Sequence, residues 1–219
     1  MAEMAGVALT FDDGPDPRGT PEVLEALARV RAVATFFVLG ERVEQEPALL
    51  ERVLEAGHDV QVHGHAHLRH SEHTRETVEE DLVRALDALP VRPTLWRLPY
   101  GEPAEFSEEI AKAHGLTIVR WTVDSYDWRG DEAETMLAAV EPELKDGAVV
   151  LMHDGASTAR HTPALIGPLA HAIRAKGLEP GRIGLSSSER SRDGAVDATD
   201  SGGGDRGGVG GAGRGAGCE

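Results

Sequence analysis

The sequence predicts an α/β fold, in the form of a distorted or incomplete (β/α) barrel with about seven parallel strands. Short apolar segments alternate with amphipathic segments along residues 1–185, and repeated strand–helix units are typical of a parallel sheet covered by helices. Ionisable residues follow directly after several of the apolar segments, where parallel α/β folds carry their active sites. An open, doubly wound sheet is the alternative that fits the same alternation.

The expected strands are short runs of apolar, β-branched and aromatic residues. In chain order they cover residues 7–11, 33–39, 59–63, 94–98, 117–123, 148–153 and 182–185.

Between the strands, apolar residues at helical spacing predict amphipathic helices. The first begins at Thr20 and Pro21, which suit the N-cap and N1 positions, and carries apolar residues as far as Val30. The second covers residues 47–56 and is closed by Gly57 at the C′ position. The remaining helices are expected near residues 74–89, 106–114, 132–144 and 163–176.

Composition divides the chain into a folded domain over residues 1–185 and a glycine-rich tail over residues 186–219. Of the 34 residues in this tail 11 are glycine, and very few are apolar, so we expect the tail to be disordered. The single cysteine, Cys218, excludes a disulfide framework and a cysteine-based metal module.

The net charge of −16 argues against nucleic acid or an anionic membrane surface as a partner. No apolar run is long enough to span a membrane, and the N-terminus lacks the basic and apolar regions of a signal peptide. We therefore expect a cytoplasmic protein from the chain as given, or a secreted one if the sequence has been trimmed. The sequence indicates no protein partner.

Ionisable residues follow five of the expected strands, so the fold would bring them to one rim of the barrel. These residues are Asp12 and Asp13, then His63, His65 and His67, then Arg97, then Asp124 and Asp127, and finally His153.

Adjacent carboxylates at Asp12 and Asp13 repel each other unless a cation or a proton lies between them. A divalent metal on one and proton transfer by the other would remove this conflict. The alternative is that the Asp-Gly-Pro sequence simply forms a turn.

The histidines after the third strand suit a catalytic zinc site made of one aspartate and two imidazoles. His63 and His67 could share a helical face, whereas His63 and His65 could share a strand face, and spacing alone does not decide between them. We expect three other histidines of this region to lie at the surface, namely His58, His70 and His73.

Arg97 and His153 complete the polar set. An arginine at the end of a buried strand usually pairs with a carboxylate, and one carboxylate of the Asp12–Asp13 pair is available. With Asp124 or Asp127 beside it, His153 becomes a general acid oriented by a carboxylate.

Five short motifs occur in order along the chain, and through them the sequence resembles polysaccharide deacetylases with a NodB-type domain, the family-four carbohydrate esterases. The motifs are Thr10–Pro15, His63–His67, Arg97–Gly101, Asp124–Trp128 and Leu151–Asp154.

The resemblance implies a NodB-type distorted barrel and a metal-dependent hydrolase that cleaves the linear amide of N-acetylated sugars. The expected substrates carry N-acetylglucosamine-type units, as in chitooligosaccharide, peptidoglycan or a smaller glycoside. The alternatives are an esterase that removes O-acetyl groups, of the acetylxylan type, and a non-catalytic sugar-binding module.

For the metal, the resemblance implies that Asp13, His63 and His67 hold a divalent ion, most often zinc, with cobalt or another divalent ion as substitutes. His65 is left out of this set. The family usually has Ser or Thr after the first metal histidine, where its hydroxyl helps to fix the loop, and this chain has Gly64 instead.

For the reaction, the resemblance implies that Asp12 is the general base and Arg97 its partner. The backbone N–H of Tyr100 would stabilise the oxyanion. His153 would protonate the leaving amine, with Asp127 orienting it. The acetyl methyl group would lie in a slot lined by Trp128 and Leu151.

Overall fold

The computed structural model describes residues 6–155 and 159–184, so the predicted tail lies outside the described residues. The strands are β1 (Gly6–Asp12), β2 (Thr35–Val38), β3 (Asp59–Val62), β4 (Leu95–Trp96), β5 (Thr117–Ile118), β6 (Val123–Asp124), β7 (Val149–His153) and β8 (Glu179–Gly181). The α-helices are α1 (Thr20–Val30), α2 (Gly40–Gln45), α3 (Pro47–Glu55), α4 (Arg75–Ala88), α5 (Ser107–Ala113), α6 (Ala133–Val140) and α7 (Thr162–Ala175).

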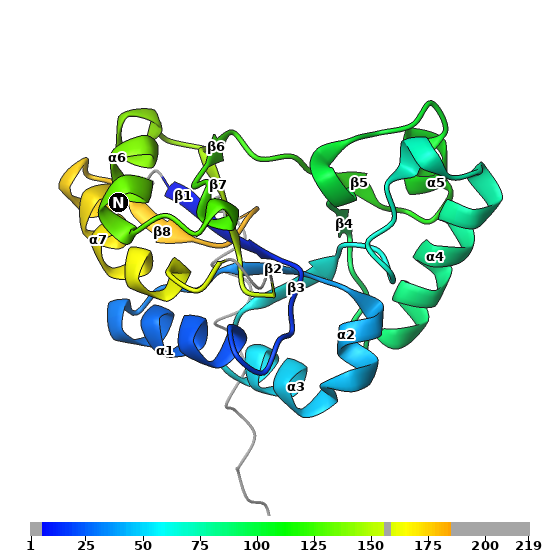
Figure 1. Cartoon of the computed structure of the whole chain (residues 1–219), viewed down its shortest axis with the longest axis horizontal. Coiled ribbons are helices and arrows are strands. Elements are labelled where there is room, and N and C mark those ends of the chain that lie inside the picture. The colour runs from blue at the N-terminus through cyan, green and yellow to red at the C-terminus, as the bar shows by residue number, and fades with distance from the viewer. Residues whose placement is uncertain (1–5, 156–158, 185–219) are drawn as a thin grey trace, which may run out of the picture.

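The strands form one curled parallel sheet with helices around its outer side (Figure 1). Their order is β5-β4-β3-β2-β1-β7-β6, and β8 pairs with the first residues of β1. Neighbouring strands therefore follow one another in sequence around the sheet, without the reversal of order that defines a doubly wound sheet. The predicted incomplete (β/α) barrel is confirmed.

The barrel is interrupted between β5 and β6, where the sequence predicts one strand over residues 117–123. This prediction is wrong in one respect, because the segment changes partners in its middle. The Val119 N–H donates to the Trp96 carbonyl at 2.9 Å, whereas the Thr122 N–H donates to the Val149 carbonyl at 3.0 Å. The segment thus joins the two open edges of the sheet and divides into two short strands.

Successive side chains of β7 point alternately to the hydrophobic core and to a pocket. Val150 and Met152 are fully buried in the larger core cluster, against the helical layer. Leu151 and His153 lie on the opposite face and line a pocket at the carboxyl end of the barrel. Helices α1 and α7 pack beside each other on the outer side (Figure 1).

Two local predictions also need correction, and one short helix was not predicted. Thr20 is inside α1 and Gly19 takes the N-cap position, because the Thr20 hydroxyl accepts the Asp16 N–H and donates to Asp154. The last strand lies at Glu179–Gly181, not at residues 182–185. Helix α2 was not predicted, since six residues are too few to show helical periodicity.

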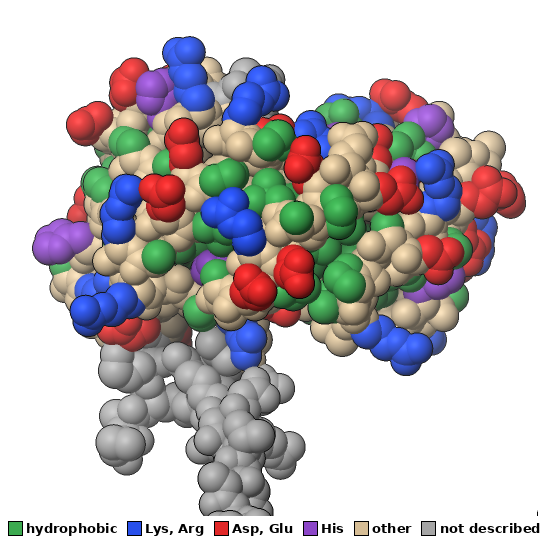
Figure 2. Space-filling model, turned by 90° about the horizontal axis from the view of Figure 1, so that it is seen from below, with side chains coloured by type: hydrophobic (Ala, Val, Ile, Leu, Met, Phe, Trp, Pro, Cys, Tyr) green, Lys and Arg blue, Asp and Glu red, His purple; other side chains and the backbone are tan. Residues whose placement is uncertain are grey.

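None of the helices in the described residues is long and apolar enough to cross a membrane. On the face seen in Figure 2, acidic and basic side chains are interspersed, and the described residues form no extended basic surface there.

His58 and His70 are buried, which corrects the prediction that both lie at the surface. His58 Nδ1 accepts the Ala34 N–H at 3.1 Å, so this nitrogen carries no proton. His70 packs against Trp96, and its Nδ1 lies 3.0 Å from the Ser107 hydroxyl. Burial lowers the pKa of each imidazole to about 4.

The two buried histidines should make the protein sensitive to mild acid. Protons bind these imidazoles more tightly in the unfolded chain than in the folded one, so stability falls as the pH drops below the unfolded pKa of about 6.5. At pH 5 each histidine should lower the free energy of unfolding by about 2 kcal/mol relative to pH 7.5. The measurement is urea denaturation of the wild type, His58→Gln and the control His73→Gln at both pH values. His58→Gln should lose about half of this pH dependence, and an unchanged pH dependence would contradict the prediction.

Candidate active site

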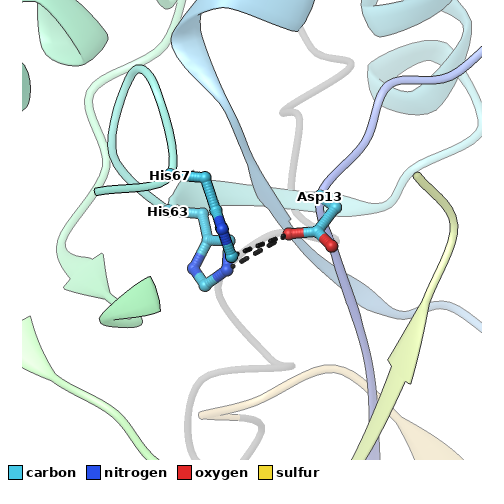
Figure 3. Close-up of side chains that lie close together, drawn as sticks. All are labelled: Asp13, His63 and His67. Carbon is cyan, nitrogen blue, oxygen red and sulfur yellow. Dashed lines mark ion pairs between the residues drawn. The ribbon is translucent and has the colours of Figure 1, made fainter. Parts of the chain in front are cut away.

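The side chains of Asp13, His63 and His67 converge at the carboxyl end of the sheet (Figure 3). Asp13 Oδ1 lies 3.4 Å from His63 Nε2 and 3.4 Å from His67 Nε2. The three possible ligand atoms, one from each residue, all lie within 4.8 Å of one another. The three residues come from the ends of β1 and β3, as expected for a parallel barrel.

The chemistry of this cluster suits a cation. Asp13 Oδ1 is buried and has no hydrogen-bond partner within the described part of the chain, and a bound metal ion would satisfy this oxygen. His63 Nδ1 donates to the Arg97 carbonyl at 2.7 Å, which leaves Nε2 free of a proton in the neutral imidazole and directed at Asp13. A backbone carbonyl that fixes the tautomer in this way is typical of metal-binding histidines.

His65 faces away from the cluster, although its spacing allowed it as a ligand. Its ring is buried, and its Nε2 lies 3.4 Å from a Glu44 carboxylate oxygen on α2. His67 reaches Asp13 instead because its backbone has a positive φ of 53°, which neither a regular helix nor a strand would give.

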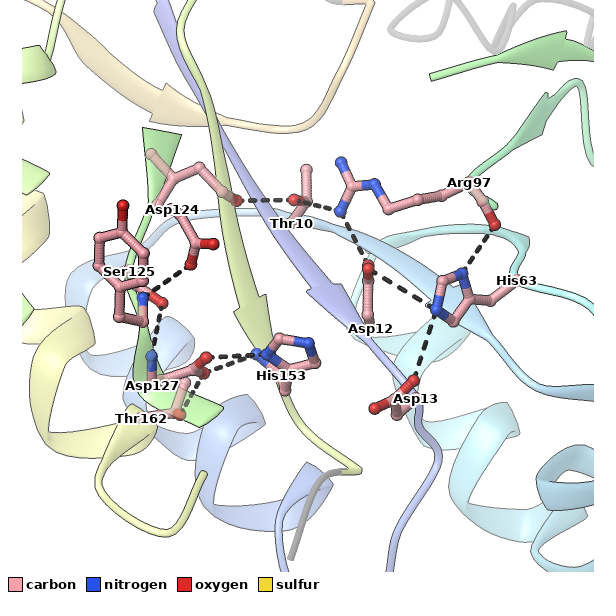
Figure 4. A network of polar contacts seen from close by, with 12 residues as sticks. Thr10, Asp12, Asp13, His63, Arg97, Asp124, Ser125, Asp127, His153 and Thr162 are labelled. Carbon is pink, nitrogen blue, oxygen red and sulfur yellow. Dashed lines mark hydrogen bonds and ion pairs between the residues drawn. The ribbon is translucent and has the colours of Figure 1, made fainter. Parts of the chain in front are cut away.

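Beside the cluster, Asp12 is held by a fully buried arginine (Figure 4). Arg97 Nη1 donates to Asp12 Oδ1 at 2.8 Å and to the Thr10 hydroxyl at 2.7 Å. The guanidinium also stacks over Phe37, with 4.1 Å between Cζ and the ring centroid. Asp12 is therefore fixed in place while its Oδ2 remains directed toward the cluster, 3.8 Å from His63 Nε2.

Across the site, His153 is bound to Asp127 (Figure 4). His153 Nδ1 lies 2.8 Å from Asp127 Oδ1, and Asp127 Oδ2 accepts both the His153 N–H and the Thr162 hydroxyl. Burial acts to lower the pKa of His153, but the bond to Asp127 and the charges of Asp127, Asp12 and Asp13 outweigh it and raise that pKa to about 9. The imidazole is therefore protonated at neutral pH. The bond to Asp127 uses Nδ1, so Nε2 is free of that bond in the pocket.

Sheet register sets the spacing between the two halves of the site. Asp12 in β1 pairs directly with His153 in β7, so their side chains leave the sheet on the same face. Parallel strands are about 4.8 Å apart, and this places a carboxylate and a protonated imidazole side by side.

These residues line a pocket of about 470 Å³. Tyr100 and Trp128 are exposed on its walls, with 49% and 45% of their surfaces accessible. Leu151 is buried in it. Trp121 packs so closely against Gly101 that a Cβ on this glycine would lie 2.6 Å from the indole. The lining residues in the described part are Asp12, Asp13, His63, His67, Leu98, Tyr100, Glu102, Trp121, Asp124, Trp128, Leu151 and His153.

Backbone strain is concentrated around the pocket. The described residues include five non-glycine positions with positive φ, and four of them carry or adjoin the polar set: Asp13, His67, Tyr100 and Tyr126. Each left-handed residue costs about 1 kcal/mol or more, and such strain typically accumulates at functional sites.

Three residues in or next to the pocket have a location that the sequence did not predict. Trp121 could have belonged to the core or to a pocket wall, and it lines the pocket. Glu102 lines the pocket beside Tyr100 and pairs with Arg69 at 2.5 Å. Asp154 ends the fifth motif and had no predicted role; it is buried under the site, where desolvation raises its pKa to about 7. The only signal for Glu102 was its position next to a predicted site residue.

An incomplete parallel barrel that gathers carboxylates, histidines and a buried arginine around one pocket, at the carboxyl ends of its strands, has the architecture of an enzyme active site. Comparison with known families then identifies the particular one. Residues 3–119 match the sequence profile described as polysaccharide deacetylase, and the chain belongs to this family.

Individual relatives agree with this assignment. A peptidoglycan-N-acetylglucosamine deacetylase of Bacillus cereus is 34% identical over 176 residues, covering 78% of this chain and 83% of that protein. A bifunctional xylanase/xylan deacetylase of Cellvibrio japonicus is 36% identical over 81% of this chain, which spans only 27% of that protein. Among solved structures, a family 4 carbohydrate esterase from Streptomyces lividans in complex with acetate superposes with a TM-score of 0.76. It is 33% identical, and the match covers 82% of this chain and 93% of that chain.

Proposed function

We propose that this protein is a metal-dependent deacetylase that hydrolyses the acetamide of N-acetylglucosamine-type units. The observation that carries the proposal is Asp13 Oδ1, which is buried between His63 Nε2 and His67 Nε2 and has no hydrogen-bond partner among the described residues. The two residues that we assign to proton transfer, Asp12 and His153, lie on adjacent strands beside this cluster and pair with each other in register.

Asp13, His63 and His67 would hold the divalent ion, and one carboxylate with two imidazoles is a ligand set that suits zinc. When bound, such an ion lowers the pKa of a coordinated water toward about 7 and polarises a carbonyl oxygen. Three protein ligands leave open positions, which is typical of catalytic rather than structural metal sites.

Asp12 is the proposed general base. Its Oδ1 is bound by Arg97, and its Oδ2 is directed toward the cluster, so this oxygen can accept a proton from water. Arg97 is buried and cannot lose its own proton under ordinary conditions. It therefore holds the carboxylate in a fixed orientation throughout the reaction.

His153 is the proposed general acid. An amine anion is a poor leaving group, so amide hydrolysis requires a proton at the departing nitrogen. The raised pKa of His153 supplies a protonated imidazole at neutral pH, and Asp127 fixes its orientation. The backbone N–H of Tyr100 is the proposed oxyanion donor, and Leu151 and Trp128 would enclose the acetyl methyl group.

The pocket favours a sugar substrate without negative charge. No lysine or arginine is among the described residues that line it, whereas Glu102 and Asp124 are. The partly exposed rings of Tyr100 and Trp128 offer aromatic surface for sugar rings, although Arg69 lies over Tyr100 and Arg129 lies over Trp128. N-acetylated glycans such as chitooligosaccharide, the peptidoglycan backbone or a smaller glycoside satisfy these conditions.

An O-acetyl esterase is the second candidate, because the Cellvibrio japonicus relative is named a xylan deacetylase. The esterase solved with acetate is consistent with either reaction, since both release that product. A protonated His153 favours the amide, because an alkoxide needs less help to leave. A sugar-binding module would not need both an acid and a base in register.

Metal removal tests the proposal. Protein treated with a chelator should lose activity on acetylated chitooligosaccharides, and one equivalent of zinc or cobalt per chain should restore it. Elemental analysis beside assays on chitooligosaccharides, acetylxylan and free N-acetylglucosamine gives both the metal and the substrate class. Full activity without any divalent ion would refute metal dependence, and activity confined to acetylxylan would favour the esterase.

A further inference from the structure

We infer that Asp81, on α4, is a positioning residue that fixes the loop carrying both metal-binding histidines. This inference rests on the proposed metal site at Asp13, His63 and His67. Nothing in the sequence pattern marked Asp81, which lies in the middle of a helix between positions of the apolar stripe.

Asp81 binds two consecutive backbone groups of the loop. Its Oδ2 accepts the His65 N–H at 2.8 Å, and its Oδ1 accepts the Ala66 N–H at 2.9 Å. An ionised carboxylate only accepts hydrogen bonds, and bonds to a charged acceptor are about twice as strong as neutral ones. One side chain thus holds the backbone midway between His63 and His67.

The helix that supplies this carboxylate is firmly packed. Its residues Val78, Leu82 and Ala85 are buried in the second core cluster, together with Trp96 and Leu98 from the β4 region. Asp81 therefore connects the loop to a helix that is itself packed into the core.

The opposite side of the loop is held by α2. The Gly64 carbonyl accepts the Gly40 N–H at 3.0 Å, and the His65 carbonyl accepts the Glu41 N–H at 3.2 Å. Helix α2 therefore holds carbonyl groups of the loop, while Asp81 holds its N–H groups. Both contacts precede His67, whose positive φ of 53° must be maintained for its ring to reach Asp13.

Gly64 makes the approach of Asp81 sterically feasible. Its φ is +95°, a conformation that side-chain-bearing residues rarely adopt, and a Cβ there would lie 2.9 Å from Asp81 Oδ2. A serine or threonine at this position would compete with the carboxylate for the same space. In this chain the loop has no hydroxyl at position 64, and the Asp81 carboxylate on α4 binds the loop instead.

The first arm of the experiment measures metal affinity by competition with a chromogenic chelator, using zinc. Asp81→Asn exchanges one acceptor oxygen for an amide donor, which cannot bind a second N–H. Zinc affinity should fall about 10–100-fold, as is typical when a residue that supports a metal ligand is changed. Gly64→Ala should weaken zinc in the same direction, because its Cβ displaces the carboxylate. Asp87→Asn, an exposed site on the same helix, is the matched control and should bind zinc like the wild type.

The second arm uses metal-free protein and hydrogen exchange at the amides of His65 and Ala66. These two amides should exchange faster in Asp81→Asn than in the wild type, while amides in β1 and β7 stay unchanged. Asp81→Glu keeps the charge, and its longer side chain should restore part of the protection, which covers the case in which Asp81→Asn folds poorly.

The outcomes separate the inference from the proposed function. A wild type that binds no divalent ion would refute the metal site, and the exchange rates would still decide whether Asp81 fixes the loop. A wild type that binds zinc, together with an Asp81→Asn variant of equal affinity and equal exchange rates, would overturn the inference alone.

Discussion

Asp12→Asn should lower kcat by about 10²–10⁴-fold, the usual loss when a general base is removed, while the protein keeps its full metal content. The asparagine retains the shape of the side chain and an oxygen for Arg97, but it cannot take a proton from water. Asp13→Asn should behave differently, because Asp13 Oδ1 stands between the two imidazoles. This variant should lose the metal as well as the activity.

Elemental analysis and kcat measured on both variants decide between the two roles. Thermal melting is the necessary control, because Arg97 is fully buried and loses its charged partner in Asp12→Asn. An Asp12→Asn variant that is folded but metal-free would show that Asp12, not Asp13, holds the ion. A variant that turns over at nearly the wild-type rate would show that Asp12 is not the general base.

His153→Ala should have its largest effect on amide substrates. We expect kcat on an N-acetylated chitooligosaccharide to fall about 10²–10⁴-fold, and kcat on an O-acetylated sugar to fall much less, since only the amine requires protonation to leave. The measurement is kcat for both substrates with the wild type and the variant. Equal losses on the two substrates would contradict the assignment of His153 as the acid.

The pH profile gives an independent check on the same residue. Because the acid must be protonated, activity should fall as the pH rises through the pKa of His153, which its carboxylate neighbours raise to about 9. A divalent ion beside Asp13 would lower this pKa in every variant that binds it. Asp127→Asn removes the main group that raises it, so the alkaline limb of kcat should move to lower pH. An alkaline limb that does not move would mean that another group controls it.

The sequence was sufficient to bring most of the candidate residues together, because they lie at strand ends. Asp12, Arg97 and His153 each terminate an apolar run, and a parallel barrel brings such positions to one rim. Spacing could not choose between His65 and His67, because the choice depends on a left-handed backbone at His67 and on the burial of His65 against α2.

Other features depend on contacts that sequence patterns do not report. Asp81 lies on a helix, and its carboxylate binds directly to loop residues that precede that helix in the chain. The segment over residues 117–123 reads as one strand, since alternation does not reveal which neighbour each half will pair with. The residues next to His58 and His70 in the sequence are largely polar, so nothing there predicts burial. Their burial follows from tertiary contacts, with Phe36 packed against His58 and Trp96 against His70.

The direct pairing of Asp12 with His153 also limits how the chain can change in length. A single-residue insertion or deletion within β7 would turn every later side chain to the other face of the sheet. A deletion would move the imidazole to the core-facing position that Met152 now fills, and an insertion would bring Met152 to the pocket position of His153. Length variation in β1 or β7 would therefore abolish activity and folding together. Insertions that adapt this scaffold to new glycans are restricted to the connections outside these two strands.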